Sequence, residues 1–164
     1  MERKIIGIFY SPWDEEMERR RTSRRAIDLY RYAVWFKANP RPRDYMRALF
    51  TERFPSGIFF DVKESPEWRT HTGRADTVVL LYPDSIGLGF TGLEREVRRL
   101  LKPWAAVHIL NGRRRECLMN AGTSRALMVR RVLEQSMLAE LLFTPIFVCV
   151  TPFLLTIDLL RGRR

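Results

Sequence analysis

The chain is poor in the residues that cysteine- and histidine-based sites require. Its 164 residues include two cysteines and two histidines, which are Cys117, Cys149, His71 and His108. Two cysteines exclude a disulfide framework, and neither has a cysteine or histidine at the spacing of zinc ligands. The sequence therefore predicts reduced thiols and no bound metal.

Several motifs of known enzyme classes are also missing. The sequence has no G-x-x-x-x-G-K-[ST] phosphate loop and no G-x-S-x-G nucleophile elbow. It has no repeat period, which excludes a solenoid. The chain is 46% hydrophobic, which excludes intrinsic disorder, and its length suits one domain. We therefore expect a folded domain, and whether it is an enzyme stays open.

Basic residues outnumber acidic ones, and the excess is uneven along the chain. The formal net charge is +10, from 29 Lys and Arg against 19 Asp and Glu. Residues 41–85 hold seven groups of each sign, whereas residues 113–136 hold six basic and two acidic groups. This densest excess directly precedes the most apolar stretch of the chain. The arrangement favours a membrane surface over nucleic acid as the partner of the basic groups.

Four short apolar runs are typical of strands that are covered on both faces. Each is rich in β-branched or aromatic residues, and they occupy residues 4–10, 57–62, 77–82 and 106–111. Helical stretches over residues 14–37, 42–52 and 92–101 lie between them. This alternation predicts an α/β fold, a small three-layer domain around a mostly parallel four-stranded sheet with strand order 2-1-3-4. In architecture alone it resembles Rossmann and flavodoxin-like domains and half of a two-domain glycosyltransferase.

The C-terminal part of the sequence predicts membrane attachment. Residues 141–157 carry no charge, and this run approaches the roughly 20 residues that a membrane-spanning helix needs. Because its two prolines favour kinks, a re-entrant bend is an alternative to a full crossing, and a buried core helix is another. The expected membrane residues are Leu141, Phe143, Pro145, Phe147, Val150, Pro152, Phe153 and Leu155.

This interpretation divides the chain into four segments. Residues 1–118 form the α/β domain, 119–136 a basic amphipathic connecting helix, 137–160 the membrane segment and 161–164 a basic tail. The helix and the tail suit anionic lipid headgroups. Because no secretory signal precedes the first strand, we expect the protein to be membrane-associated with its body facing the cytoplasm.

A glycine-rich segment follows the third predicted strand. It reads G-x-G-x-x-G between a strand and a helix, where backbone amides and a helix N-terminus can bind phosphate. The carboxyl ends of parallel strands meet at one edge of a sheet, so polar residues after the fourth strand should join this segment. The alternative is a glycine-rich turn that packs against its neighbours. The expected phosphate-binding residues are Gly87, Gly89, Gly92, Asn111, Arg113 and Arg114.

Three polar residues near the predicted strand ends are candidates for a catalytic role. Asp14 follows the first strand, and Asp84 and Ser85 follow the third. Asp84 could serve as a general base if burial or neighbouring charges shift its pKa. The alternative role for Asp84 is that of a structural acid within a turn. The residues identify no cofactor.

Together these features predict a membrane-anchored cytoplasmic α/β protein that binds a phosphate-bearing ligand. An anion site beside a membrane suits a nucleotide-sugar or a lipid phosphate, as used in the assembly of cell-envelope glycans or lipids. The expected partners are membrane lipids and a membrane enzyme or envelope-assembly protein, and nucleic acid is not expected. The alternative is a non-catalytic adaptor or accessory subunit of a larger membrane complex.

Overall fold

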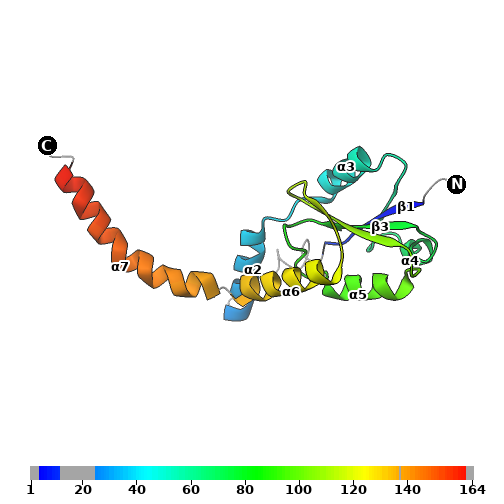
Figure 1. Cartoon of the computed structure of the whole chain (residues 1–164). Coiled ribbons are helices and arrows are strands. Elements are labelled where there is room, and N and C mark those ends of the chain that lie inside the picture. Colours follow the sequence, from blue (N-terminus) through cyan, green and yellow to red (C-terminus); the bar gives the residue numbers. More distant parts are fainter. Residues whose placement is uncertain (1–3, 12–24, 137, 162–164) are drawn as a thin grey trace.

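A five-stranded sheet forms the centre of the folded body in the computed structural model, which describes residues 4–11, 25–136 and 138–161 (Figure 1). The strand order is β2-β1-β3-β4-β5. The first four strands are parallel to one another, and β5 is antiparallel to β4. The strands are β1 (Ile5–Phe9), β2 (Ile58–Asp61), β3 (Thr77–Tyr82), β4 (Ala106–Asn111) and β5 (Glu116–Leu118).

The prediction of a mostly parallel α/β sheet is confirmed, but the prediction of four strands was one short. The four predicted runs are all strands, in the predicted order 2-1-3-4. The missing strand, β5, has three exposed residues, Glu-Cys-Leu. It pairs with β4 through a hairpin and is itself an edge strand of the sheet, so it has no covered apolar run from which sequence periodicity could detect it.

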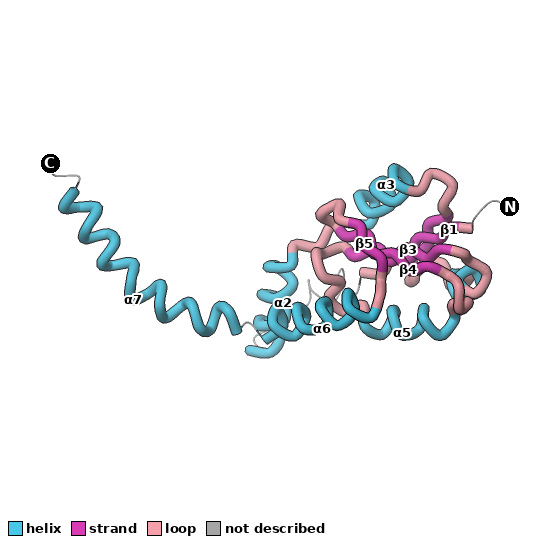
Figure 2. The backbone as a smooth tube through the Cα atoms, viewed as in Figure 1, coloured by secondary structure: helices cyan, strands magenta, loops and turns pink. Residues whose placement is uncertain are grey.

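Helices cover both faces of the sheet (Figure 2). α3 packs on one face, where it forms an apolar cluster with alternate residues of the strands, namely Phe9, Val79, Leu81 and Leu110. The other strand residues face α4 and α5 in a second cluster that includes Ile6, Ile8, Val78 and Leu80. The helices are α2 (Ala26–Ala38), α3 (Arg43–Arg53), α4 (Trp68–Thr72), α5 (Thr91–Leu100), α6 (Ala121–Ser136) and α7 (Leu138–Arg161).

The central strand β3 is the most deeply covered part of the sheet. Its residues from Val78 to Tyr82 have no exposed surface, because helices cover both of its faces. Each such side chain contributes roughly 1.5–3 kcal/mol of burial free energy. The loop after β3 therefore starts from a rigid position, which matters because this loop borders the candidate site.

The N-terminal helix predicted from the sequence falls partly outside the described residues. The sequence predicts a helix over residues 14–37, and the structure describes α2 from Ala26 to Ala38. Asp14 lies outside the described residues. α2 packs through Val34 against Ile86 and Leu88 of the loop that follows β3.

The predicted membrane segment is helical, as α7, which bends away from the body in Figure 1. It contains Pro145 and Pro152. In the part of the chain that the structure describes, no helix combines the length and the apolar character needed to cross a membrane. The structure thus gives no support to a C-terminal membrane-spanning helix.

Candidate anion-binding groove

A groove of about 600 Å³ lies at the carboxyl ends of β3 and β4 and extends between the β4–β5 edge of the sheet and α6. It is bounded by the loop after β3, by the hairpin between β4 and β5, and by α6. This is the edge at which open α/β sheets bind their ligands. The residues that line it are Ser85, Ile86, Ile109, Asn111, Arg113, Arg115, Glu116, Cys117, Thr123, Ala126, Leu127, Arg130, Leu133 and Glu134.

Asp84 organises the loop that forms one wall of this groove. Its Oδ1 accepts hydrogen bonds from the backbone amides of Ile86, at 2.7 Å, and Gly87. Its Oδ2 accepts a third from the amide of Leu88 at 2.8 Å. Of the three glycines that the sequence assigned to phosphate, only Gly87 donates its amide to this carboxylate, and the geometry is that of a structural acid within a turn.

Burial raises the pKa of Asp84 above its ordinary value, against the opposing effect of the three backbone amides and Arg131. The side chain is 2% exposed, and Asp84 is not among the residues that line the large groove. An acid–base role for Asp84 stays a prediction. In this structure its carboxylate makes contacts that shape the loop.

The three glycines of the G-x-G-x-x-G segment have different conformations. Gly87 and Gly89 have φ of 68° and 82°, a region that other residues adopt at a cost of about 1–2 kcal/mol. A Cβ on Gly87 would lie 2.6 Å from the Tyr82 ring. Gly92 lies in the first turn of α5, and a Cβ there would have no neighbour within 4 Å. Backbone geometry therefore requires the first two glycines and not the third.

Asn111 ties the β4–β5 hairpin to the loop after β3. Its Oδ1 accepts hydrogen bonds from the amides of Arg113 and Arg115, both at 3.0 Å. Its Nδ2 donates to the carbonyl oxygen of Ser85 at 3.2 Å. Asn111 thus fixes the turn that presents the neighbouring arginines.

The structure separates the two arginines that the sequence paired. Arg113 lines the groove. Arg114, in the left-handed region with φ of 62°, turns towards α3, where its Nη2 lies 3.6 Å from Glu52. In its place, Arg115 and Arg130 line the groove. No signal in the sequence pointed to Arg115, because residues 112–115 form a turn in which side chains do not alternate as they do in a strand.

The two glutamates that line the groove have partners of their own. Glu116 lies 2.9 Å from Nδ1 of His108, and Glu134 lies 2.7 Å from Nζ of Lys37. Among the described residues, no ion pair involves Arg113, Arg115 or Arg130. The groove therefore contains three arginines whose charge is not neutralised by its two glutamates.

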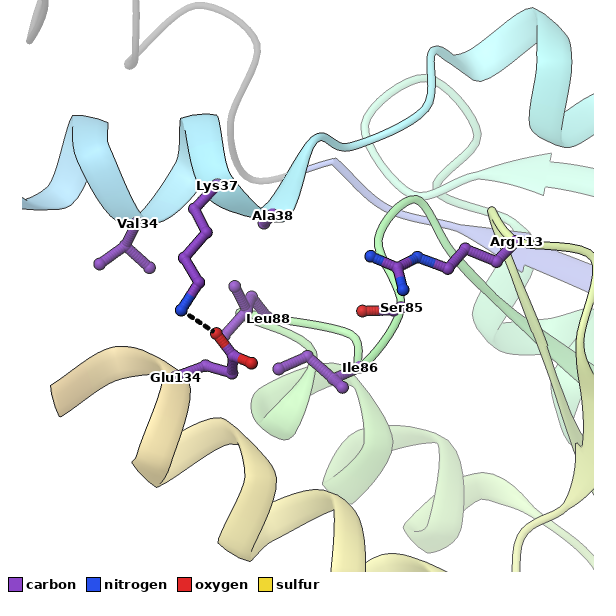
Figure 3. Close-up of a pocket in the computed structure, with 8 residues that line it drawn as sticks. All are labelled: Val34, Lys37, Ala38, Ser85, Ile86, Leu88, Arg113 and Glu134. Atoms are coloured by element: carbon purple, nitrogen blue, oxygen red, sulfur yellow. Dashed lines mark ion pairs between the residues drawn. The ribbon is translucent and has the colours of Figure 1, made fainter. Parts of the chain in front are cut away.

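A smaller cavity of about 80 Å³ lies between α2, α6 and the loop after β3. Figure 3 shows it with the Lys37–Glu134 ion pair on one side and Arg113 and Ser85 on the other. Because Ser85, Ile86, Arg113 and Glu134 line both cavities, the small cavity is an extension of the groove. Within the described chain, the Ser85 hydroxyl has no histidine or carboxylate partner, and a catalytic role for it stays a prediction.

Cys117 is a thiol in the wall of the groove. Burial raises its pKa above the ordinary value, and the charge of Glu116 raises it further. The thiol is therefore less reactive at neutral pH than an ordinary exposed cysteine. It offers a local chemical probe for anything that occupies the groove.

A buried ion pair fixes α6 against the body behind the groove. Arg131 is 7% exposed, and its guanidinium contacts Glu94 of α5 at 2.5 and 3.2 Å. Its Nε donates to the carbonyl oxygen of Ile86 at 2.8 Å. The Tyr82 hydroxyl donates to the same Glu94 carboxylate at 2.5 Å. The sequence showed Arg131 only as one more charge of a basic helix and gave no signal that it is buried.

The electrostatics of this cluster favour a charged Arg131–Glu94 pair and a neutral Tyr82. Burial raises the pKa of the Tyr82 hydroxyl, and the adjacent Glu94 carboxylate raises it further. Burial acts to lower the pKa of Arg131, but the hydrogen bonds and charge of Glu94 outweigh it and raise that pKa. Arg131 thus stabilises the fold, whereas the neighbouring Arg130 is exposed and lines the groove.

The arrangement is suited to binding an anion. Among residues 4–11, 25–136 and 138–161, no cluster of three or more His, Cys, Asp or Glu side chains could hold a metal ion. The phosphate-binding roles of Gly87, Gly89, Gly92 and Arg114 stay predictions, and Asn111 and Arg113 are the predicted residues that the structure brings to the groove. No family model, curated protein or solved structure matches this chain.

Proposed function

We propose that this protein binds a phosphate-bearing ligand in the groove beyond β3 and β4. The observation that carries the proposal is the set of three arginines, Arg113, Arg115 and Arg130, that line the groove without an ion-pair partner among the described residues. Arginine binds phosphate oxygens through two parallel N–H donors. Thr123 of α6 and Cys117 of β5 also line the groove.

The size and lining of the groove suit a ligand larger than inorganic phosphate. Its volume of about 600 Å³ falls within the range of roughly 300–1,000 Å³ that ligand pockets occupy. Ile86, Ile109 and Leu127 provide an apolar surface next to the arginines. A nucleotide-sugar and a lipid phosphate both combine a phosphate with a larger body, so both fit this description.

In this proposal the arginine side chains, and not the glycine-loop amides, neutralise the phosphate. The amides of Ile86, Gly87 and Leu88 already donate to Asp84, so phosphate would have to displace a buried carboxylate to use them. The loop instead supplies one wall of the groove. A role in cell-envelope glycan or lipid assembly, and a body that faces the cytoplasm, remain proposals drawn from the sequence.

Replacing Arg113 with glutamine is expected to weaken phosphate binding. A hydrogen bond to a charged group contributes about 1.5–3 kcal/mol, so the dissociation constant for inorganic pyrophosphate or a nucleotide-sugar should rise roughly 10- to 100-fold. Arg115→Gln and Arg130→Gln should act in the same direction. Titration calorimetry at fixed, low ionic strength measures the effect, because arginine–phosphate contacts weaken as salt is added.

The matched control is Arg114→Gln in the same hairpin. This substitution removes an equal charge from a side chain that contacts Glu52 and not the groove. It should change the dissociation constant less than twofold, within the small effect of a distant exposed charge. If the Arg113 and Arg114 variants lost the same affinity, binding would depend on overall charge. The groove would then not be the phosphate-binding site.

The exposure of α7 favours a second candidate function, that of a non-catalytic adaptor. Its exposed apolar side chains include Phe153 at 74% and Val148 at 67%, and the helix bends away from the body in Figure 1. Such a surface is typical of an interaction site. An adaptor of this kind needs no ligand in the groove, so wild-type protein that binds none of the phosphate compounds would favour it.

A further inference from the structure

The outward side of α6 is apolar. Four of its side chains are more than half exposed, at 66%, 59%, 56% and 51%, and they are Met128, Val129, Val132 and Leu133. Their spacing of three and four residues places them side by side on the helix. Surface helices of soluble domains normally show polar groups to the solvent, so this face is the reverse of the usual pattern.

The orientation of α6 is fixed by its other side. Arg131 is the buried residue of α6, and its contacts with Glu94 and the Ile86 carbonyl oxygen hold that side against α5 and the loop after β3. Rotating the helix to bury its valines would bring this guanidinium out of its ion pair. The packing of Arg131 therefore fixes the apolar face of α6 in an exposed position.

Charge indicates what the apolar face of α6 would contact. Arg125 precedes Val129 by one helical turn and Arg130 borders the groove, and both are exposed. The one carboxylate on α6, Glu134, is paired with Lys37 of α2. An apolar face accompanied by arginines and without a free carboxylate is the combination that binds an anionic lipid surface.

We propose that α6 docks on an anionic bilayer and that the adjoining groove takes the phosphate of a lipid headgroup. The inference rests on the proposed function and selects the lipid phosphate as the ligand class. Arg130 and Leu133 connect the two surfaces, because both line the groove and Leu133 also belongs to the exposed apolar face. A lipid phosphate beside Arg130 and Arg113 would thus have its hydrocarbon chains next to Leu133.

The test uses the full chain and vesicles of phosphatidylcholine with or without phosphatidic acid. The double substitution Val129→Gln and Val132→Gln is expected to weaken partition onto the phosphatidic acid vesicles by roughly tenfold or more, because two exposed valines no longer reach the apolar layer. Both positions are exposed, so folding should be unchanged. Its calorimetric affinity for soluble pyrophosphate should match that of the wild type, because neither valine lines the groove.

A local readout separates α6 from the exposed helix α7. A polarity-sensitive fluorophore is attached to Met128→Cys in a chain that also carries Cys117→Ser and Cys149→Ser. Phosphatidic acid vesicles should shift its emission to the blue, and the same label at Glu52→Cys on α3 should not respond. Phosphatidylcholine alone should produce a smaller shift, and Arg113→Gln should reduce the response to phosphatidic acid.

The outcomes distinguish this inference from the proposed function. Unchanged vesicle binding in the valine variant, or no blue shift at position 128, would overturn the docking of α6 while leaving the pyrophosphate result intact. Vesicle binding that is indifferent to Arg113→Gln would overturn the headgroup assignment. If wild-type protein binds no soluble phosphate compound and does not respond to phosphatidic acid, both proposals fail together.

Discussion

Replacing Arg131 with methionine is expected to lower the free energy of unfolding by about 3–5 kcal/mol, the range for breaking a buried ion pair. The substitution leaves the Glu94 carboxylate buried without its cation and removes the donor to the Ile86 carbonyl oxygen. A domain of this size has a total stability of roughly 5–15 kcal/mol, so the loss is a large share of it. Urea unfolding followed by circular dichroism measures the change.

The control is the same substitution one residue earlier, Arg130→Met. Arg130 is exposed, and among the described residues no ion pair involves it, so its free energy of unfolding should change by less than about 0.5 kcal/mol. Combining Arg131→Met with Glu94→Leu removes both buried charges and should recover part of the loss. If Arg130→Met and Arg131→Met lowered the free energy of unfolding equally, the claim that Arg131 stabilises the fold through a buried ion pair would be contradicted.

The first and third glycines of the G-x-G-x-x-G segment should respond to alanine with opposite signs. Gly87→Ala is expected to cost about 2–4 kcal/mol, from a φ of 68° and a Cβ 2.6 Å from the Tyr82 ring. The ring cannot easily move, because its hydroxyl is bound to Glu94. Gly92→Ala should stabilise α5 by about 0.5–1 kcal/mol, since alanine favours the helix.

Thermal or urea unfolding of the two alanine variants checks this prediction. Gly92 also serves as the internal control, because its substitution adds the same methyl group five residues along the chain where nothing lies within 4 Å. A stable Gly87→Ala protein would show that the loop can adopt another conformation. The amide contacts of Asp84 would then not define its shape.

The sheet could be predicted from sequence because its signal is local. The four parallel strands are continuous apolar runs such as Thr77–Tyr82, and helices cover both of their faces. The antiparallel strand Glu116–Leu118 carries no such run, since it is exposed and paired with one neighbour. Its position depends on the hairpin turn that Asn111 organises. The turn is held by hydrogen bonds between the Asn111 side chain and the backbone, and residue composition does not reveal such contacts.

The position of the groove was predictable from the sequence, but the roles of the residues around it were not. The rule that ligands bind beyond the carboxyl ends of parallel strands selected the edge that contains Asn111 and Arg113. It did not show that Asp84 accepts hydrogen bonds from the loop amides, because the sequence left both a turn acid and a catalytic acid open. Arg130 and Arg131 are adjacent and identical in type, and only the packing of α6 separates a groove residue from a buried one.

Protection of Cys117 from alkylation tests most directly whether the groove binds phosphate. A Cys149→Ser chain has a single thiol, in the groove wall, and mildly alkaline buffer offsets its raised pKa. Pyrophosphate or a nucleotide-sugar at ten times its dissociation constant should slow reaction with iodoacetamide about tenfold. Arg113→Gln should reduce this protection at the same ligand concentration, and Arg114→Gln should retain it. An alkylation rate unchanged by a ligand that calorimetry shows to be bound would place the binding site elsewhere and contradict the account.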